Sequence, residues 1–295
     1  MLNDKNKNLL IYHFLVIIFG FASILGKLIS IDALPLTIYR MSIAFVGLAV
    51  YFLIINPKYF YLDRSMWGKV FLGGFFIGLH WFTFFYAIKI AGVSLTLSMM
   101  ASGALITALI DPLLNGRKIL KHEVFFGGFA AVGIGVIYQA EFEHFFGISV
   151  AFLSAFLSAL FTILNGQMVK RARPITLSFY ELIIGSFLGL ILSYFSENIN
   201  IESFKISGMD LLWLLILGLV GTSFAFNLSI KVMKYLSPFT VMMVINLEPI
   251  YGVLLSLVIW KEKSFLSTNF YLGFLIVTGS IFVSALYKKF RVNNN

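Results

Sequence analysis

The sequence predicts an all-α polytopic membrane protein in which ten transmembrane helices form two inverted five-helix repeats. Three observations predict this fold: a strongly apolar composition, ten apolar blocks of membrane-spanning length, and a likeness between the two halves. Of the 295 residues, 60% are hydrophobic and only 12% are charged. A soluble domain carries about 25% charged residues because its surface faces water. The composition therefore excludes a water-facing globule.

Each apolar block is long enough for one helical crossing. A helix rises 1.5 Å per residue, so about 20 residues cross the roughly 30 Å of hydrocarbon. The blocks lie at residues 9–27, 35–55, 68–88, 93–113, 123–140, 146–167, 175–195, 210–230, 237–260 and 267–287. They lack the two-residue alternation of barrel strands, which favours helices. The first block is too long for the core of a signal peptide, so we expect an uncleaved first span.

The basic residues indicate the orientation of these spans. The formal net charge is +9, but lysines and arginines stand singly between apolar blocks, which favours topology signals over a nucleic-acid-binding surface. With both termini on one side, that side holds sixteen Lys and Arg, the other side holds five, and Arg40 lies within the membrane. The five are Lys27, Lys89, Lys205, Lys261 and Lys263. Both termini are therefore predicted to be cytoplasmic, and no nucleic-acid partner is expected.

The two halves resemble each other at an offset of roughly 142–146 residues. The matched strings are Ala87-Ile88-Lys89 with Ser229-Ile230-Lys231, Gly127 and Gly133 with Gly273 and Gly279, and, after a two-residue slip, Tyr39-Arg40 with Tyr180-Glu181. Because five is odd, the second repeat must enter the membrane inverted. Residues 1–141 and 142–290 are therefore predicted as the two repeats, with 291–295 as a short cytoplasmic tail. Such repeats are typical of transporters, although some channels also contain them.

Several short motifs follow one another in an order that is similar to one known family. They are Leu247-Glu248-Pro249-Ile250-Tyr251, Trp260-Lys261-Glu262-Lys263, Phe85-Tyr86-Ala87-Ile88-Lys89, the first-span segment from Gly20 to Lys27, and Arg40. Over essentially the whole chain they resemble the drug/metabolite transporter superfamily, specifically the EamA-type carriers, although Phe19 replaces the tryptophan of the first span. The resemblance implies a multi-pass carrier of the bacterial inner membrane, often an exporter of amino acids or other small metabolites. It does not name the substrate.

Four ionisable residues are predicted to lie within the membrane: Arg40, His80, Glu181 and Glu248. Each calls for a partner or a cavity, because an ionised side chain at mid-bilayer costs at least ~3 kcal/mol. The planar fork of Arg40 suits an anionic substrate group, but an internal pair with Glu181 or Glu248, or snorkelling to the headgroups, remains open. Glu248 fits a cation or proton site, or else a structural carboxylate. Glu181 fits either a binding role or helix packing.

Other candidates lie beside these residues. Pro249 lacks an N–H and clashes with the carbonyl of Ile245, which predicts a helix break, and Asn246 adds an amide there. His80 is either a proton relay or a hydrogen-bonding partner of a neighbouring helix. Trp81 is suited to stacking on an aromatic or cationic substrate. The second-rank candidates for a cavity are Tyr39, Tyr180 and Asn227.

These features favour a transporter over its rivals. The sequence contains no His-Glu-x-x-His, serine-nucleophile, aspartyl or Walker motif and no cysteine, so we expect neither an enzyme nor a bound metal or cofactor. A channel would favour a continuous polar ring, which four scattered ionisable residues do not build. We therefore predict a secondary active transporter that exports a small metabolite by alternating access, with a proton on Glu248 or His80 as the coupling ion. A flippase for a lipid-linked or amphipathic cargo is the alternative, and both a monomer and a homodimer remain open.

Overall fold

The computed structural model describes residues 4–140, 142–197, 199–260 and 267–293, and within these ranges the chain is helical with no β-strand. Six helical segments there are long and apolar enough to cross a membrane. They are Asp4–Leu28, Ala33–Ile55, Arg64–Met100, Phe145–Met168, Pro174–Phe195 and Gly208–Val232. Lys261, Glu262 and Lys263, which are named in the sequence analysis, lie outside the described ranges.

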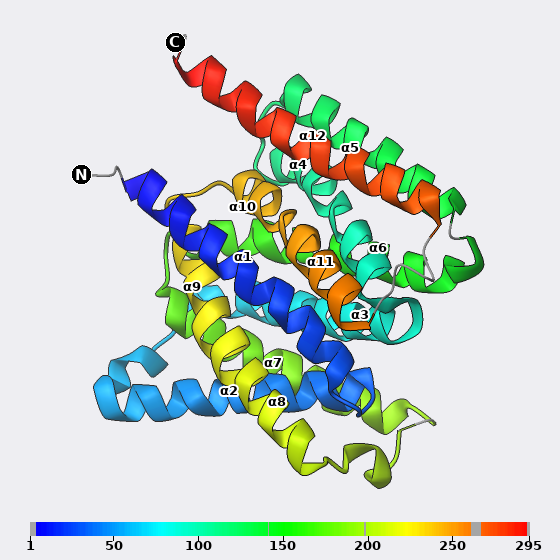
Figure 1. The fold of residues 1–295 in the computed structure, drawn as a ribbon. Coiled ribbons are helices and arrows are strands. Elements are labelled where there is room, and N and C mark those ends of the chain that lie inside the picture. The colour runs from blue at the N-terminus through cyan, green and yellow to red at the C-terminus, as the bar shows by residue number, and fades with distance from the viewer. Residues whose placement is uncertain (1–3, 141, 198, 261–266, 294–295) are drawn as a thin grey trace.

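The order of the helices follows the predicted blocks (Figure 1). The helices are α1 (Asp4–Leu28), α2 (Ala33–Ile55), α3 (Trp67–Met100), α4 (Ser102–Leu114), α5 (Lys121–Ala140), α6 (Phe145–Met168), α7 (Pro174–Phe195), α8 (Gly208–Gly218), α9 (Ala225–Val232), α10 (Pro238–Ile245), α11 (Glu248–Trp260) and α12 (Thr268–Asn293). Short 3₁₀ segments η1 (Pro57–Phe60), η2 (Arg64–Met66), η3 (Phe142–His144) and η4 (Ile201–Phe204) lie in connections, and a π-helical turn η5 (Leu219–Phe224) joins α8 to α9.

Three of the predicted blocks contain an interruption. The backbone of α3 turns at Gly92, whose φ of 85° lies in the region that favours glycine, so that the block at 93–113 continues through Ala101 into α4. The block at 210–230 runs through α8, η5 and α9, and the block at 237–260 is divided into α10 and α11. The count of ten crossings therefore remains a prediction, because the interrupted blocks do not each form one continuous helix.

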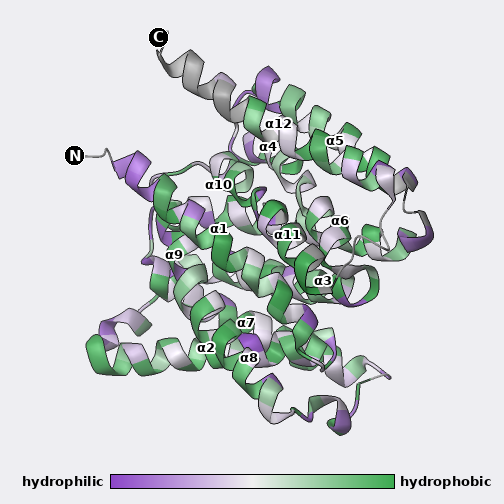
Figure 2. Ribbon diagram, viewed as in Figure 1, coloured by the Kyte–Doolittle hydropathy of each residue, from purple (hydrophilic) through white to green (hydrophobic). Residues whose placement is uncertain are grey.

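The outer surface of the bundle is apolar. Ile54 is 74% exposed and Val258 is 79% exposed, and many other large aliphatic and aromatic side chains on the same helices also face outward. Figure 2 shows hydrophobic residues along the helices, with hydrophilic residues gathered mainly at helix ends and connections. Soluble monomers rarely expose apolar surface on this scale, whereas lipid chains match it. The chain is a multi-pass membrane protein.

Equivalent contacts occur twice, once for each half of the chain. The hydroxyl of Tyr39 donates to the carbonyl oxygen of Phe204 over 2.8 Å, and that of Tyr180 donates to the carbonyl oxygen of Phe60 over 2.7 Å. These contacts anchor η4 and η1, which lie at opposite ends of the molecule (Figure 1). Likewise α1 packs on α11, and α6 packs on α4. Such reciprocal contacts at opposite ends are what an inverted repeat produces.

Glycines allow close approaches between the halves. A methyl group added at Gly133 of α5 would lie 2.7 Å from the carbonyl oxygen of Gly273 in α12, and one added at Gly273 would lie 2.7 Å from that of Gly133. The two helices therefore pack side by side at one side of the bundle (Figure 1). A methyl group added at Gly78 of α3 would lie 2.8 Å from the Cα atom of Gly185 in α7. Both contacts join the first half of the chain to the second.

The contact at Gly78 makes a testable contribution to stability. Gly78→Ala should lower the apparent melting temperature in detergent by several degrees, because backbone atoms of α7 cannot rotate away from the new methyl group. Gly135→Ala is the matched control, since nothing lies within 4 Å of a methyl group added there and alanine favours a helix by about 1 kcal/mol. Equal melting temperatures for the two variants would contradict the close approach of α3 and α7.

Candidate functional site

A cavity lies at the centre of the bundle between helices of the two halves. Its volume is about 80 Å³. Its wall is mainly aromatic and aliphatic, with a small number of polar groups. The lining residues are Tyr12, Phe19, Ala22, Arg40, Ile77, His80, Trp81, Phe84, Met100, Ser158, Phe161, Thr162, Phe226, Ser229, Met233, Ile245 and Glu248.

Arg40 is the buried cation of this cavity. Its side chain is 3% exposed, and Nε donates to Oγ1 of Thr222 over 2.7 Å. The guanidinium carbon lies 3.9 Å from the ring centroid of Trp81, an arrangement that stabilises a desolvated cation by about 2 kcal/mol. The terminal amino groups of Arg40 form no hydrogen bond or ion pair with the described residues. These two groups can therefore hold an anion.

A π-helical turn positions the partner of Arg40. Thr222 lies in η5, and its hydroxyl donates to the carbonyl oxygen of Leu217 over 2.8 Å, five residues earlier. Its neighbour Ser223 donates to the carbonyl oxygen of Ala44 in α2, one turn after Arg40, over 2.8 Å. Single π turns inside helices occur frequently at functional sites. Here the turn fixes α2 of the first half against the α8–α9 segment of the second.

Glu248 is the buried anion of the same cavity. It is the first residue of α11 and is 8% exposed. Its carboxylate forms no hydrogen bond or ion pair with the residues that the structure describes, and it lines the same cavity as Arg40 and Tyr12. The helical segment is interrupted between Ile245 and Glu248, so Pro249 falls in the first turn of α11. The interruption places this carboxylate at the cavity wall.

Two helix interruptions meet next to Glu248. Asn246 is buried, and its side-chain Nδ2 donates to the carbonyl oxygen of Ala101 over 3.2 Å. Ala101 separates α3 from α4, as Asn246 and Leu247 separate α10 from α11. The two sites are 145 positions apart, which is within the repeat offset. Asn246 therefore connects equivalent breaks of the two halves rather than lining the cavity.

His80 has a defined orientation at the cavity wall. Its Nδ1 lies 3.0 Å from the carbonyl oxygen and 2.8 Å from the hydroxyl of Ser154, and that hydroxyl lies 2.9 Å from the carbonyl oxygen of His80. A carbonyl oxygen only accepts, so the neutral ring carries its proton on Nδ1. This leaves Nε2 as the hydrogen-bond acceptor of the ring. His80 therefore combines the helix-linking contact with a basic nitrogen that is not used in that contact.

The structure brings together four of the predicted site residues, Arg40, His80, Trp81 and Glu248. Trp81 stacks on Arg40 within the protein, in the way that the sequence suggested for a substrate. Five further candidates, Tyr39, Tyr180, Glu181, Asn227 and Asn246, do not line this cavity. Their predicted functional roles have no support from the geometry of the cavity.

Glu181 lies buried between three helices. It is 0% exposed, and its Oε1 accepts from Nδ2 of Asn165 in α6 over 2.8 Å. A methyl group added at Gly73 of α3 would clash with the same oxygen. The neighbouring candidates also act elsewhere, since the two tyrosines anchor 3₁₀ segments and Asn227 lines a separate hollow beside α2 and η5.

Several cavity residues have no counterpart among the sequence candidates. Tyr12 of α1 is 1% exposed, and Ser158, Thr162 and Ser229 add hydroxyl groups from α6 and α9. Isolated hydroxyl residues are common in membrane helices, so no local pattern distinguishes these four. Only the packing of α1, α6 and α9 identifies them.

Polar contacts tie the two halves together at one end of the bundle. The backbone N–H and the hydroxyl of Ser30, between α1 and α2, donate to the Asp210 carboxylate of α8 over 2.8 and 2.5 Å. Nearby, Nζ of Lys89 in α3 donates to the carbonyl oxygen of Ile29. Charged hydrogen bonds of this kind hold more strongly than neutral ones. The hydrogen bonds of Asp210 therefore hold the second half against the first at a place outside the cavity.

The fold and the cavity define a helical multi-pass membrane protein with a central site between two related halves. The family model of the EamA-like transporter family matches the chain twice, over residues 8–139 and 145–286. The chain belongs to this family, whose members are transporters of small molecules rather than enzymes. This confirms the family and the two repeats indicated by the sequence.

One crystal structure of a protein shares this fold, with a TM-score of 0.69 and 16% sequence identity. The similarity covers 97% of this chain and 98% of the other. A search of curated proteins finds no match. The comparison with solved structures therefore supports the overall architecture and leaves the cargo to be argued from the cavity.

Proposed function

We propose that this protein is a secondary active transporter that exports a small zwitterionic metabolite across the bacterial inner membrane by alternating access, with both termini in the cytoplasm. One observation carries the proposal: a buried cation and a buried anion, Arg40 and Glu248, line one cavity between the two repeats and retain atoms without a partner among the described residues. Burying two such charges costs several kcal/mol each, so their retention favours a binding role.

The chemistry of the cavity supports an amino-acid-like cargo. The amino groups of Arg40 suit a carboxylate, and the Glu248 carboxylate suits an ammonium group. Aromatic rings of Phe84, Phe161 and Phe226 form much of the remaining wall and suit an apolar or aromatic side chain. Matched probes are phenylalanine, which carries both charges, 3-phenylpropionate, which lacks the ammonium group, and 2-phenylethylamine, which lacks the carboxylate.

The small volume of the cavity supports a site that widens when the cargo binds. Pockets that hold small ligands have volumes of roughly 300–1,000 Å³, whereas this cavity offers about 80 Å³. Binding therefore requires the halves to separate, and inverted repeats that rock against each other supply such a motion. The hydrogen bonds between Ser30 and Asp210, called here the Asp210 tie, must break if the halves are to separate at that end of the bundle. A proton on Glu248 or His80 is the proposed coupling ion.

The absence of cysteine permits a direct test of alternating access. Ser229→Cys places one thiol at the cavity wall, and a membrane-impermeant maleimide is applied to either face of sealed vesicles. We expect labelling from both faces. In addition, Asp210→Ala should raise labelling from the face next to Asp210 several-fold, because the tie between α8 and the α1–α2 connection is lost.

Glu202→Gln is the control for this experiment, because Glu202 lies in η4 and forms an exposed ion pair with Lys205. Exposed pairs contribute little, so its labelling should match that of the parent. Labelling from one face alone, in every variant and with each probe present, would contradict alternating access. Transport of an anionic lipid, but of none of the three aromatic probes, would favour the flippase alternative.

A further inference from the structure

A second hollow opens at the end of the bundle opposite the Asp210 tie. Its volume is about 420 Å³, and it lies between the end of α4, the end of α6 and the connection from α9 to α10. The side chain of Met233 lines both this hollow and the central cavity. Along α6, Thr162 lines the cavity and the next residue, Ile163, lines the hollow. The two spaces are therefore adjacent, and Met233 lies in the wall of both.

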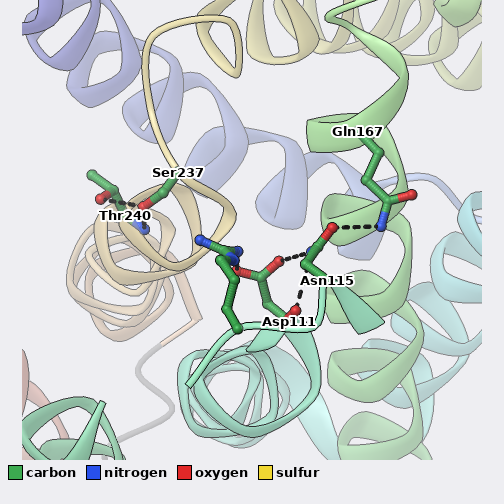
Figure 3. A network of polar contacts seen from close by, with 6 residues as sticks. Asp111, Asn115, Gln167, Ser237 and Thr240 are labelled. Atoms are coloured by element: carbon green, nitrogen blue, oxygen red, sulfur yellow. Dashed lines mark hydrogen bonds and ion pairs between the residues drawn. The ribbon is translucent and has the colours of Figure 1, made fainter. Parts of the chain in front are cut away.

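A polar network fixes one wall of this hollow (Figure 3). Nδ2 of Asn115 donates to Oδ1 of Asp111 over 2.6 Å, and Nε2 of Gln167 in α6 donates to Oδ1 of Asn115 over 3.1 Å. Arg117 pairs with the other carboxylate oxygen of Asp111. The network joins the end of α4 to α6. It also occupies the Asp111 carboxylate, which therefore does not neutralise the other cations of the hollow.

Two lysines supply the remaining charge. Lys170 and Lys234 line the hollow, and neither side-chain ammonium group forms a hydrogen bond or ion pair with the described residues. Since Arg117 and Asp111 cancel, the lining carries two positive charges in excess. Concave sites lined by one sign of charge concentrate ions of the opposite sign and raise their association rate. The cation of the adjacent central cavity is Arg40.

We propose that this hollow, named here the basic vestibule, is a first binding site in which Lys170 and Lys234 hold the carboxylate of the cargo before it passes Met233 to Arg40. This inference rests on the proposed function and adds to it that an anionic group of the cargo is recognised at two successive places. The vestibule takes organic anions and zwitterions. It disfavours cations of the same size, because like charges repel.

The charge of the vestibule can be measured without any transport. Tyr235→Cys places one thiol in its lining, and the thiol is modified in detergent by the anionic sulfonatoethyl or the cationic trimethylammonioethyl methanethiosulfonate. We expect the ratio of the anionic to the cationic modification rate to fall about tenfold when Lys170→Gln and Lys234→Gln are combined. High salt should remove most of this difference.

Arg171→Gln combined with Lys231→Gln is the matched control, because it removes the same charge from neighbouring positions that do not line the vestibule. This control should leave the rate ratio within about twofold, because both side chains are exposed outside the hollow, where water and salt screen their charge. An equal fall for both pairs would overturn the proposal, since it would show a general surface charge rather than a site.

Protection experiments identify the ligand of the vestibule. We expect 3-phenylpropionate to slow modification of Tyr235→Cys, 2-phenylethylamine to have no effect, and protection to disappear in the double lysine variant. Protection by phosphatidylglycerol nanodiscs but not by 3-phenylpropionate would overturn the cargo site in favour of a lipid headgroup. A protein that shows this protection but transports none of the probes would refute the proposed function alone. Arg40-dependent transport with an unchanged rate ratio would refute the vestibule alone.

Discussion

Arg40→Gln should lower transport of phenylalanine and 3-phenylpropionate by about 30-fold or more, while 2-phenylethylamine changes by less than about threefold. Removing one partner of a buried, hydrogen-bonded charge pair costs roughly 2–5 kcal/mol, which corresponds to about 30-fold to several thousand-fold. The effect should be specific for cargo with a carboxylate because we propose that the anion is bound by the terminal amino groups of Arg40, which have no partner among the described residues. Initial rates of counterflow in proteoliposomes measure all three probes.

Two further variants separate charge from geometry. Arg40→Lys keeps the positive charge but loses the planar fork, so we expect an intermediate loss for the two carboxylates. Arg171→Gln removes an exposed arginine outside both cavities and should leave all three rates unchanged. Melting temperature in detergent checks that Arg40→Gln still folds. If folded Arg40→Gln transports the two carboxylates at the parent rate, Arg40 serves the stability of the cavity wall and not recognition.

Glu248→Gln should lower the accumulation of phenylalanine driven by an imposed pH gradient by tenfold or more. Exchange of phenylalanine without a gradient should continue. Glutamine keeps the size of the side chain and its acceptor oxygen, but it cannot take up and release a proton. Glu248 is suited to this role because its carboxylate faces the cavity without a hydrogen-bonding partner among the described residues. Sealed vesicles with a controlled internal pH give both measurements.

Glu181→Gln is the matched control, because Glu181 is also a buried carboxylate. It accepts a hydrogen bond from Asn165 and lies outside the cavity. We expect it to retain gradient-driven accumulation. If Glu248→Gln keeps accumulation and His80→Asn loses it, the coupling proton belongs on His80 instead. Loss of exchange together with accumulation in Glu248→Gln would show that the cargo itself requires the charge of Glu248, and it would contradict a coupling role of Glu248 that is separate from cargo binding.

Much of the architecture follows from local properties of the sequence. Blocks such as 9–27 and 146–167 coincide with α1 and α6, because apolar composition and length suffice to specify a helix in lipid. The likeness of the halves was equally visible, and it is confirmed by the two matches of the family model. Arg40 and Glu248 stood out because a charge inside an apolar block is rare and costly.

The partners of these residues depend on packing between helices. The sequence left Arg40 with Glu181 or Glu248 as a partner, whereas the structure gives it Thr222 and the face of Trp81 and places Glu181 among α3, α6 and α7. Tyr12 lines the cavity without any signal in the sequence. Hydropathy and residue spacing fix how deep a side chain lies along its helix. The neighbours that its helical face meets are set by interhelical contacts between residues far apart in the chain, and for this reason only the folded bundle distinguishes a cavity residue from a packing residue.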